Sequence, residues 1–247
     1  MELKNRKILV TGGASGIGLE IVKLLSSENK IIIVGRNQEK LQKAKEISNN
    51  ITTITGDLST DKGLKAITDE VKLNHSDLSV LINNAAEASA HSLQTFAGVS
   101  EKAEKEINTN YLSVLRLNEA LLPVLTKQQD AAIVNVTSIV ALTPAVNIPT
   151  YSASKAALRA YTQLLRAELA KVSSVKVFEL MPPLVDTELS AGIGGKQNGI
   201  PPKAVAERLI EGIQQDEFEI HVARTKDFYN AFFAQASGAF AAMNAGR

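Results

Sequence analysis

Cysteine is absent from the 247-residue chain, and histidine occurs only three times. The lack of thiols excludes disulfide bonds and thiolate metal sites. His75, His91 and His221 lie far apart in the sequence, which argues against a histidine zinc site. We therefore expect a protein without a bound metal.

Neither sign of charge prevails, because 27 Lys and Arg stand against 26 Asp and Glu, for a formal net charge of +1. Nucleic-acid binding needs a clustered basic face, so no nucleic-acid partner is expected. No apolar run approaches the length of a membrane span. The opening MELKNRKILVTGG leads directly into an expected strand and lacks the organisation of a signal peptide. These absences predict a soluble cytoplasmic protein.

The chain has no Pro/Gly/Ser-rich linker and no internal repeat, which predicts a single domain over residues 1–247. Short runs rich in Ile, Val and Leu read as strands at 7–12, 30–35, 51–56, 78–84, 131–138, 175–183 and 217–223. Helical patterns lie between them, the longest within 101–125 and 151–171. Apolar strands separated by helices are typical of a mostly parallel sheet with helices on both faces. The expected fold is a doubly wound, Rossmann-type α/β sheet of seven strands.

Two segments near the C-terminus stand apart from this alternation. Residues 186–200 contain four glycines and little apolar content, which predicts a mobile substrate loop over a site. The segment 224–247 is expected to form a helical tail, in which Phe228, Phe232 and Phe233 make an apolar stripe. Core packing, a subunit interface and contact with a membrane surface all remain open for this stripe.

The glycine-rich segment TGGASGIG (11–18) joins the first expected strand to the first helix. Glycines at such a junction allow a tight turn and a close approach of the backbone to a phosphate at the helix N-terminus. The spacing Gly12-x-x-x-Gly16-x-Gly18 differs from the usual G-x-G-x-x-G, so a plain structural turn is the alternative. The position after the first strand favours dinucleotide binding.

The second expected strand ends in Gly35-Arg36-Asn37 and has no acid there. A carboxylate at this place usually holds the ribose hydroxyls of NAD and would repel a 2′-phosphate. Arg36 can instead pair with that phosphate, so we expect NADP(H) rather than NAD(H). A solvated arginine at a strand end is the alternative.

Tyr151 and Lys155 lie four residues apart at the start of a predicted helix and therefore share one face. Tyr-x-x-x-Lys alone is a weak pattern. Ser138 strengthens it, because it ends the fifth strand at the carboxyl edge of the sheet, where ligands of open α/β folds bind. Thirteen residues separate Ser138 from Tyr151, close enough for the two hydroxyl groups to meet.

Over residues 5–223 these motifs together resemble the short-chain dehydrogenase/reductase family in its compact single-domain form. The matching segments are TGGASGIG, GDLS (56–59), NNAA (83–86), INTNYLS around Asn110, YSASK (151–155) and PPLVDT (182–187). The resemblance implies a catalytic tetrad of Asn110, Ser138, Tyr151 and Lys155. It implies that the cofactor contacts Gly12, Ser15, Gly16, Ile17, Gly18, Arg36, Asp57, Leu58, Asn84, Tyr151, Lys155, Pro182, Val185 and Thr187.

The resemblance also assigns roles to the tetrad. A free tyrosine has a pKa near 10, and we expect the Lys155 ammonium to lower that of Tyr151. Tyr151 then exchanges a proton with a carbonyl or alcohol oxygen, and Ser138 polarises the same oxygen. Lys155 is expected also to hold the nicotinamide ribose. Asn110 is expected to anchor a water that links Lys155 to solvent. The alternative is that it only stabilises an irregularity in the helix.

The expected activity is NADP(H)-dependent interconversion of a carbonyl and a secondary alcohol on a small molecule. A catalytically silent NADP-binding regulatory or sensor protein is the alternative. Members of the family commonly form dimers or tetramers, so a homodimer or homotetramer is expected. Ile139, Leu142, Val146, Leu184 and Leu189 predict an apolar substrate pocket, with simple packing as the alternative.

Three positions depart from the family pattern. Ala86 replaces a glycine after Asn-Asn-Ala, Ser113 replaces a common glycine after Asn110, and Pro183 replaces the glycine of a Pro-Gly turn. Each substitute is small or compatible with a turn, so shifted geometry is expected rather than lost binding.

Overall fold

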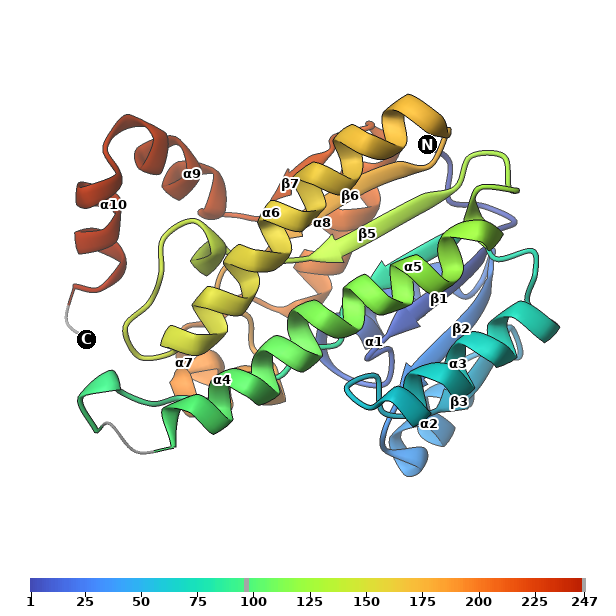
Figure 1. Cartoon of the computed structure of the whole chain (residues 1–247), viewed down its shortest axis with the longest axis horizontal. Coiled ribbons are helices and arrows are strands. Elements are labelled where there is room, and N and C mark those ends of the chain that lie inside the picture. The colour runs from blue at the N-terminus through green and yellow to red at the C-terminus, as the bar shows by residue number, and fades with distance from the viewer. Residues whose placement is uncertain (96–97, 246–247) are drawn as a thin grey trace.

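A computed structural model describes residues 1–95 and 98–245 of the chain. Its centre is a seven-stranded sheet in the order β3-β2-β1-β4-β5-β6-β7, and every neighbouring pair is parallel. The strands are β1 (Lys7–Thr11), β2 (Lys30–Gly35), β3 (Ile51–Thr55), β4 (Val80–Asn83), β5 (Ala132–Val136), β6 (Lys176–Met181) and β7 (Glu219–His221). The doubly wound sheet predicted from the sequence is therefore confirmed, and it is parallel throughout (Figure 1).

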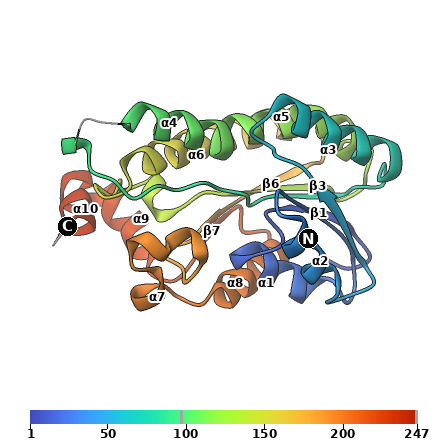
Figure 2. The same cartoon turned by 90° about the horizontal axis from the view of Figure 1, so that it is seen from below.

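Helices cover both faces of the sheet, as Figure 2 shows in edge view. One layer consists of α3 (Asp61–Asn74), α4 (Val99–Ile107), α5 (Ser113–Leu125) and α6 (Pro149–Val172). The opposite layer consists of α1 (Gly16–Leu25), α2 (Gln38–Lys45) and α8 (Pro202–Gln214). The strand order reverses between β1 and β4, and ligands of doubly wound sheets bind at the carboxyl end of such a switch point.

The apolar strands follow from this two-sided cover. Successive side chains of a strand point to opposite faces of the sheet. In β1, Ile8 and Val10 join the core that contains α1 and α8, while Leu9 joins the core that contains α3 and α5. All three are fully buried, so the middle of the strand has no side chain that faces water.

The long helix expected within 101–125 is present but interrupted. Between α4 and α5, residues Asn108–Leu112 form a π-helical turn, and Asn110 lies within it. Such turns are rare and often occur at functional sites. The alternative role for Asn110 required an irregular helix at this place, and the π-helical turn is that irregularity.

The segment after β6 has regular structure over most of its length. Residues Glu188–Ile193 form the 3₁₀ helix η4, and Gly195–Asn198 form the short helix α7. A bridge between Val185 and Ile200 closes the segment at its base. The mobility expected for residues 186–200 stays a prediction.

Two helices follow β7, namely α9 (Thr225–Ala234) and α10 (Ala236–Met243), and they lie beyond the carboxyl end of the central strands (Figure 1). Phe228 packs against a small core cluster that contains Ile139 and Ile148, which supports core packing for this member of the stripe. Phe233 is exposed. Among residues 1–95 and 98–245, no helix is long and apolar enough to cross a membrane.

Candidate active site

A cleft of about 570 Å³ opens at the carboxyl edge of the sheet, where the switch point lies. It is lined by most of the residues that the sequence predicted to be catalytic or to contact a cofactor, namely Gly12, Ser15, Gly16, Ile17, Arg36, Asp57, Leu58, Asn84, Ser138, Tyr151, Lys155, Pro182, Val185 and Thr187. Two nominated residues, Gly18 and Asn110, lie behind the wall of the cleft. The arrangement brings the expected catalytic and cofactor groups into one cavity.

The glycine loop forms one end of this cleft. Gly12 and Gly16 have φ angles of +65° and +52°, which other residues adopt only at a cost in strain. A Cβ on Gly18 would lie 2.4 Å from the Gly12 carbonyl oxygen, so the loop and the first turn of α1 pack without room for a side chain. Ser15 occupies the N-cap but makes no side-chain capping bond, so the first N–H groups of α1 have no side-chain cap. Such a helix terminus can receive a phosphate.

Thr11 joins the glycine loop to the end of β4, a role that the sequence analysis missed. Its hydroxyl oxygen accepts hydrogen bonds from the backbone N–H groups of Asn84 (2.9 Å) and Ala85 (3.0 Å). The Asn84 amide donates in return to the Thr11 carbonyl at 2.9 Å. These bonds fix Asn84 at the switch point. The only sequence signal for Thr11 was its place immediately before the glycines.

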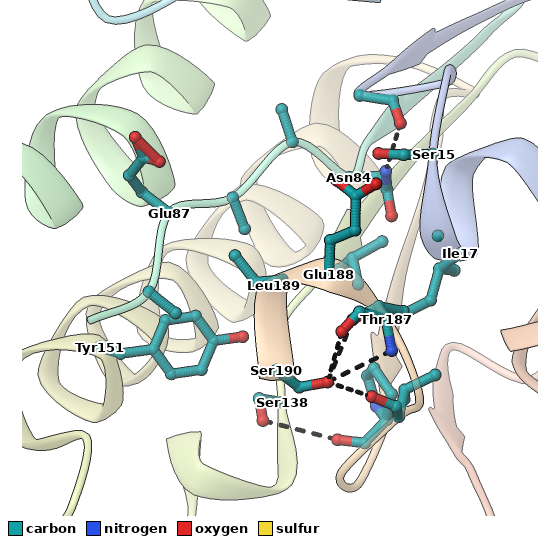
Figure 3. A pocket seen from close by; sticks show the side chains of 18 of the residues that line it. Ser15, Ile17, Asn84, Glu87, Ser138, Tyr151, Thr187, Glu188, Leu189 and Ser190 are labelled. Carbon is teal, nitrogen blue, oxygen red and sulfur yellow. Dashed lines mark hydrogen bonds between the residues drawn. The ribbon is translucent and has the colours of Figure 1, made fainter. Parts of the chain in front are cut away.

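Ser138 and Tyr151 meet in the cleft. Ser138 follows β5 and caps the 3₁₀ helix η3 (Ile139–Ala141), with its hydroxyl 3.5 Å from the Pro182 carbonyl. Figure 3 shows the Tyr151 ring projecting from the first turn of α6 into the pocket. The ring is partly open to the cleft but enclosed enough that burial raises the pKa of Tyr151 above its ordinary value. Interaction with the Ser138 hydroxyl lowers this pKa and the carboxyl of Glu106 raises it, and burial prevails.

Lys155 lies behind Tyr151 and is only 2% exposed. Its ammonium donates a 2.8 Å hydrogen bond to the carbonyl of Val136, at the end of β5, and lies 5.6 Å from the centre of the Tyr151 ring. Burial lowers the pKa of Lys155 to about 7. The expectation that Lys155 brings the Tyr151 pKa below 10 is therefore wrong for this structure, because burial disfavours the charged form of both groups.

Asn110 connects three segments from its place in the π-helical turn. Its side-chain oxygen accepts from the Glu87 N–H, and its nitrogen donates to the Glu87 carbonyl, both at 2.8 Å. The same nitrogen donates to the Ser154 hydroxyl at 2.9 Å. Asn110 thus holds the loop after β4 against α6, beside Lys155. The water link proposed for Asn110 stays a prediction.

Charged groups surround the expected adenosine end. Arg36 pairs with Glu87 at 3.2 Å, and Lys105 pairs with the same carboxylate at 3.4 Å. Asp57 accepts hydrogen bonds from the backbone and hydroxyl of Ser59 at 2.9 and 2.7 Å. Burial raises the pKa of Asp57, but these bonds and the nearby Arg36 and Lys105 outweigh it, so the pKa lies below its ordinary value. Glu87 was not among the site residues predicted from the sequence, although it follows NNAA directly.

The segment after β6 closes the opposite side. Thr187 and Ser190 form a capping box at the start of η4, which confirms the capping role weighed for Thr187. A Cβ on Gly16 would lie 3.1 Å from the Thr187 methyl group, so Thr187 also stands directly over the glycine loop. Lys40 of α2 forms an ion pair with Glu188 of η4. Pro183, a departure from the family pattern, lies in the cleft wall beside Pro182.

The model of the short chain dehydrogenase family matches residues 6–198. The chain belongs to the short-chain dehydrogenase/reductase family. It is 33% identical over 255 aligned residues to the uncharacterized oxidoreductase DltE of Bacillus subtilis, with 99% of this chain and 98% of that protein covered. It is 31% identical to the uncharacterized oxidoreductase SSP0419 of Staphylococcus saprophyticus, over 87% of this chain and 94% of that protein. Membership in this family of oxidoreductases confirms the resemblance drawn from the motifs.

Solved structures of the family share the fold. A short chain dehydrogenase from Burkholderia cenocepacia in complex with NADP has a TM-score of 0.87 at 24% identity, covering 98% of this chain and 99% of that one. A short chain dehydrogenase/reductase from Burkholderia phymatum in complex with NAD has a TM-score of 0.85 at 19% identity, covering 95% of this chain and 96% of that one.

In the part of the chain that the structure describes, no group of three His, Asp or Glu residues is placed to hold a metal ion.

Proposed function

We propose that this protein is an NADP(H)-dependent oxidoreductase that interconverts a carbonyl compound and a secondary alcohol. One observation carries the proposal. Ser138, Tyr151 and Lys155 converge in one cleft with the glycine loop, at the switch point of the sheet. Proton transfer and nucleotide binding thus have their groups within a single cavity.

The residues present fit a nicotinamide dinucleotide. The loop at Gly18 leaves no room for a side chain, and the uncapped start of α1 offers N–H groups to a phosphate. Lys155 is a buried ammonium, and its one hydrogen bond among the described residues goes to the carbonyl of Val136. Ribose hydroxyls would satisfy its remaining donors. When bound, the cofactor supplies a hydride to the substrate or takes one from it.

The preference for NADP(H) rests on Arg36. It lines the cleft just after β2, with Lys40 on the first turn of α2, and these cations would hold the 2′-phosphate. The side chain of Asn37 is occupied, since it caps α2 by accepting from the Lys40 N–H at 2.9 Å. Two related structures were solved with NADP or NADPH, and another with NAD. The cations at the end of β2 favour the phosphorylated cofactor.

Tyr151 acts as the acid in reduction. Because burial keeps its pKa high, the hydroxyl carries its proton at neutral pH and can donate it to the carbonyl oxygen as the carbonyl carbon gains a hydride. The Ser138 hydroxyl donates a hydrogen bond to the same oxygen and stabilises the charge that develops there. The Lys155 ammonium beside the ring stabilises the phenolate as it forms. In oxidation, the same groups remove the proton from the alcohol.

The test is NADPH consumption with a panel of aldehydes and ketones, comparing the wild type with Tyr151→Phe. The substitution is expected to reduce turnover by about 10²–10⁴-fold, the usual contribution of a general acid, and to leave NADPH affinity nearly unchanged. Tyr229→Phe is the matched control, because Tyr229 lies on α9 outside the cleft wall. Full turnover by Tyr151→Phe would refute the assignment. Tight NADPH binding with no turnover of any carbonyl would favour the sensor alternative.

A further inference from the structure

Arg224 is the one charged side chain of the cleft wall without a partner among residues 1–95 and 98–245. The other charged residues of the wall are all engaged. Arg36 pairs with Glu87, and Lys40 with Glu188. Asp57 accepts from Ser59 and Lys155 donates to Val136. Arg224 is exposed to solvent at the cleft, so its guanidinium is available for a ligand.

The placement of α9 locates Arg224 at the end of the cleft that holds the reacting groups. Arg224 precedes the first residue of α9, and Phe228 follows it by four residues, so the two lie on one face. Phe228 packs against the cluster that contains Ile139 and Tyr151. In addition, α9 contacts η3, which begins directly after Ser138. Arg224 therefore belongs to the substrate end of the cleft rather than to its adenosine end.

Much of the wall around the reacting hydroxyl groups is apolar, although Asn147 and Ser190 also line the cleft. Its apolar residues are Ile139, Val140, Leu184, Leu189, Ile193 and Met243. Met243 comes from α10, which is fastened by Asn244 to the loop before α6: the Asn244 side chain accepts from the Val146 N–H at 2.7 Å and donates to the Pro144 carbonyl at 2.9 Å. Over the residues that the structure describes, the cavity thus has proton-transferring groups, a largely apolar wall and one cation without a partner. A ligand that fits all three has a carbonyl, an apolar body and an anionic group.

We propose that Arg224 selects substrates that carry a carboxylate, separated by an apolar segment from the carbonyl that is reduced. The inference rests on the proposed reductase function and names the substrate class of that same site. A guanidinium binds a carboxylate through two parallel hydrogen bonds, which gives orientation as well as affinity. Asp227 follows three residues further on, and no ion pair between it and Arg224 is present among the described residues. The acids of the cleft wall each have another partner: Glu87 pairs with Arg36, Glu188 with Lys40, and Asp57 accepts from Ser59.

The decisive experiment compares straight-chain oxo acids of increasing length with their methyl esters as substrates. The wild type is expected to prefer the acid of each pair. Arg224→Gln is expected to lower kcat/KM for the acids by about 10–100-fold, mainly through a higher KM. The reason is the loss of the charge-assisted hydrogen bonds between Arg224 and the carboxylate. The esters should be unaffected. Lys226→Gln is the matched control, because this neighbouring exposed cation does not line the cleft.

Two results would overturn the inference while the reductase function stands. One is a wild type that prefers the esters, and the other is an equal loss for acids and esters in Arg224→Gln. If no carbonyl compound is turned over, the reductase function fails. Thermal stabilisation then tests separately whether Arg224 binds a carboxylate. With NADP present, the acids should raise Tm in the wild type and not in Arg224→Gln, whereas equal shifts in both proteins would reject the site.

Discussion

The side chain of Asn110 and the backbone of Glu87 are joined by two hydrogen bonds of 2.8 Å, one in each direction. Asn110 is fully buried in a π-helical turn, and Glu87 lies in the loop that follows β4 at the edge of the cleft. Because Glu87 in turn pairs with Arg36, the helical irregularity is connected to the residue that we expect to choose the cofactor. This relationship makes the π-helical turn a structural support of the site.

Replacing Asn110 by leucine should therefore destabilise the fold. The apolar side chain leaves the Glu87 N–H and carbonyl without their partner, and each unsatisfied buried group costs about 1–3 kcal/mol. Denaturant unfolding is expected to show a loss of about 2–4 kcal/mol. Asn74→Leu is the control, because among the described residues the Asn74 amide donates only to Glu70, on an exposed surface. Equal stability of Asn110→Leu and the wild type would contradict this role.

Gly18→Ala should impair cofactor binding without touching a catalytic group. The added Cβ would lie 2.4 Å from the Gly12 carbonyl oxygen and 2.6 Å from the Asn84 amide, so the glycine loop must move. Overpacking of this kind costs about 1–3 kcal/mol and should weaken NADPH binding measured by fluorescence. Gly238→Ala, where the nearest atom is 3.5 Å away, should keep full affinity. If both variants bind equally well, the close packing of the loop is unimportant.

Lys155 should make the stability of the cofactor-free protein depend on pH. Burial lowers its pKa from 10.5 to about 7 in the folded chain, so the unfolded chain binds more protons between these values. Stability contributed by this residue therefore rises as pH increases from about 7 to 10.5. Lys155→Met removes the buried charge and should raise Tm by a few degrees at or below neutral pH, where the penalty is largest.

Thermal melts across this pH range provide the measurement. The Tm difference between Lys155→Met and the wild type should shrink as the pH rises, while turnover is lost at every pH. Lys171→Met, an exposed lysine on the same helix, is the control and should show no such trend. A Tm difference that stays constant with pH would rule out the titration of Lys155 as its cause.

Arg36→Ala should separate the two nicotinamide cofactors. Loss of a cation that pairs with the 2′-phosphate is expected to weaken NADPH binding by about 10–100-fold and to leave NADH binding unchanged. Isothermal titration with both cofactors measures this difference. Arg116→Ala, which removes a surface pair with Asp61, serves as the control. Tighter binding of NADH than NADPH by the wild type would reject the NADP preference itself.

Much of this architecture could be predicted because its causes are local in the sequence. A strand buried on both faces needs a continuous apolar run, and KILVT and KIIIVG have that form. The glycine loop, Ser138 and the Tyr151 helix fall at fixed points of the strand–helix alternation. Parallel strands bring those points to one edge, so the composition of the cleft followed from their order.

Other features depend on packing between distant segments. The bonds of Asn110 reach Glu87 and Ser154 across 23 and 44 residues, and no local pattern specifies them. Glu87 as the partner of Arg36 was missed for the same reason, since their separation is 51 residues. The two short helices within residues 186–200 also escaped prediction, because a glycine-rich segment has no helical periodicity.

The sequence by itself determined which chemistry the site contains: a phenol, an ammonium and a hydroxyl at one sheet edge beside a glycine cradle. Only the tertiary structure decided how those groups are charged. Packing of the sheet and its helices buries Lys155 and encloses Tyr151, and burial disfavours both ionised forms. Their spacing of one helical turn predicted a lowered pKa for Tyr151, whereas burial raises it. Sequence spacing indicates a neighbouring charge, but it does not indicate how far packing removes water from the group.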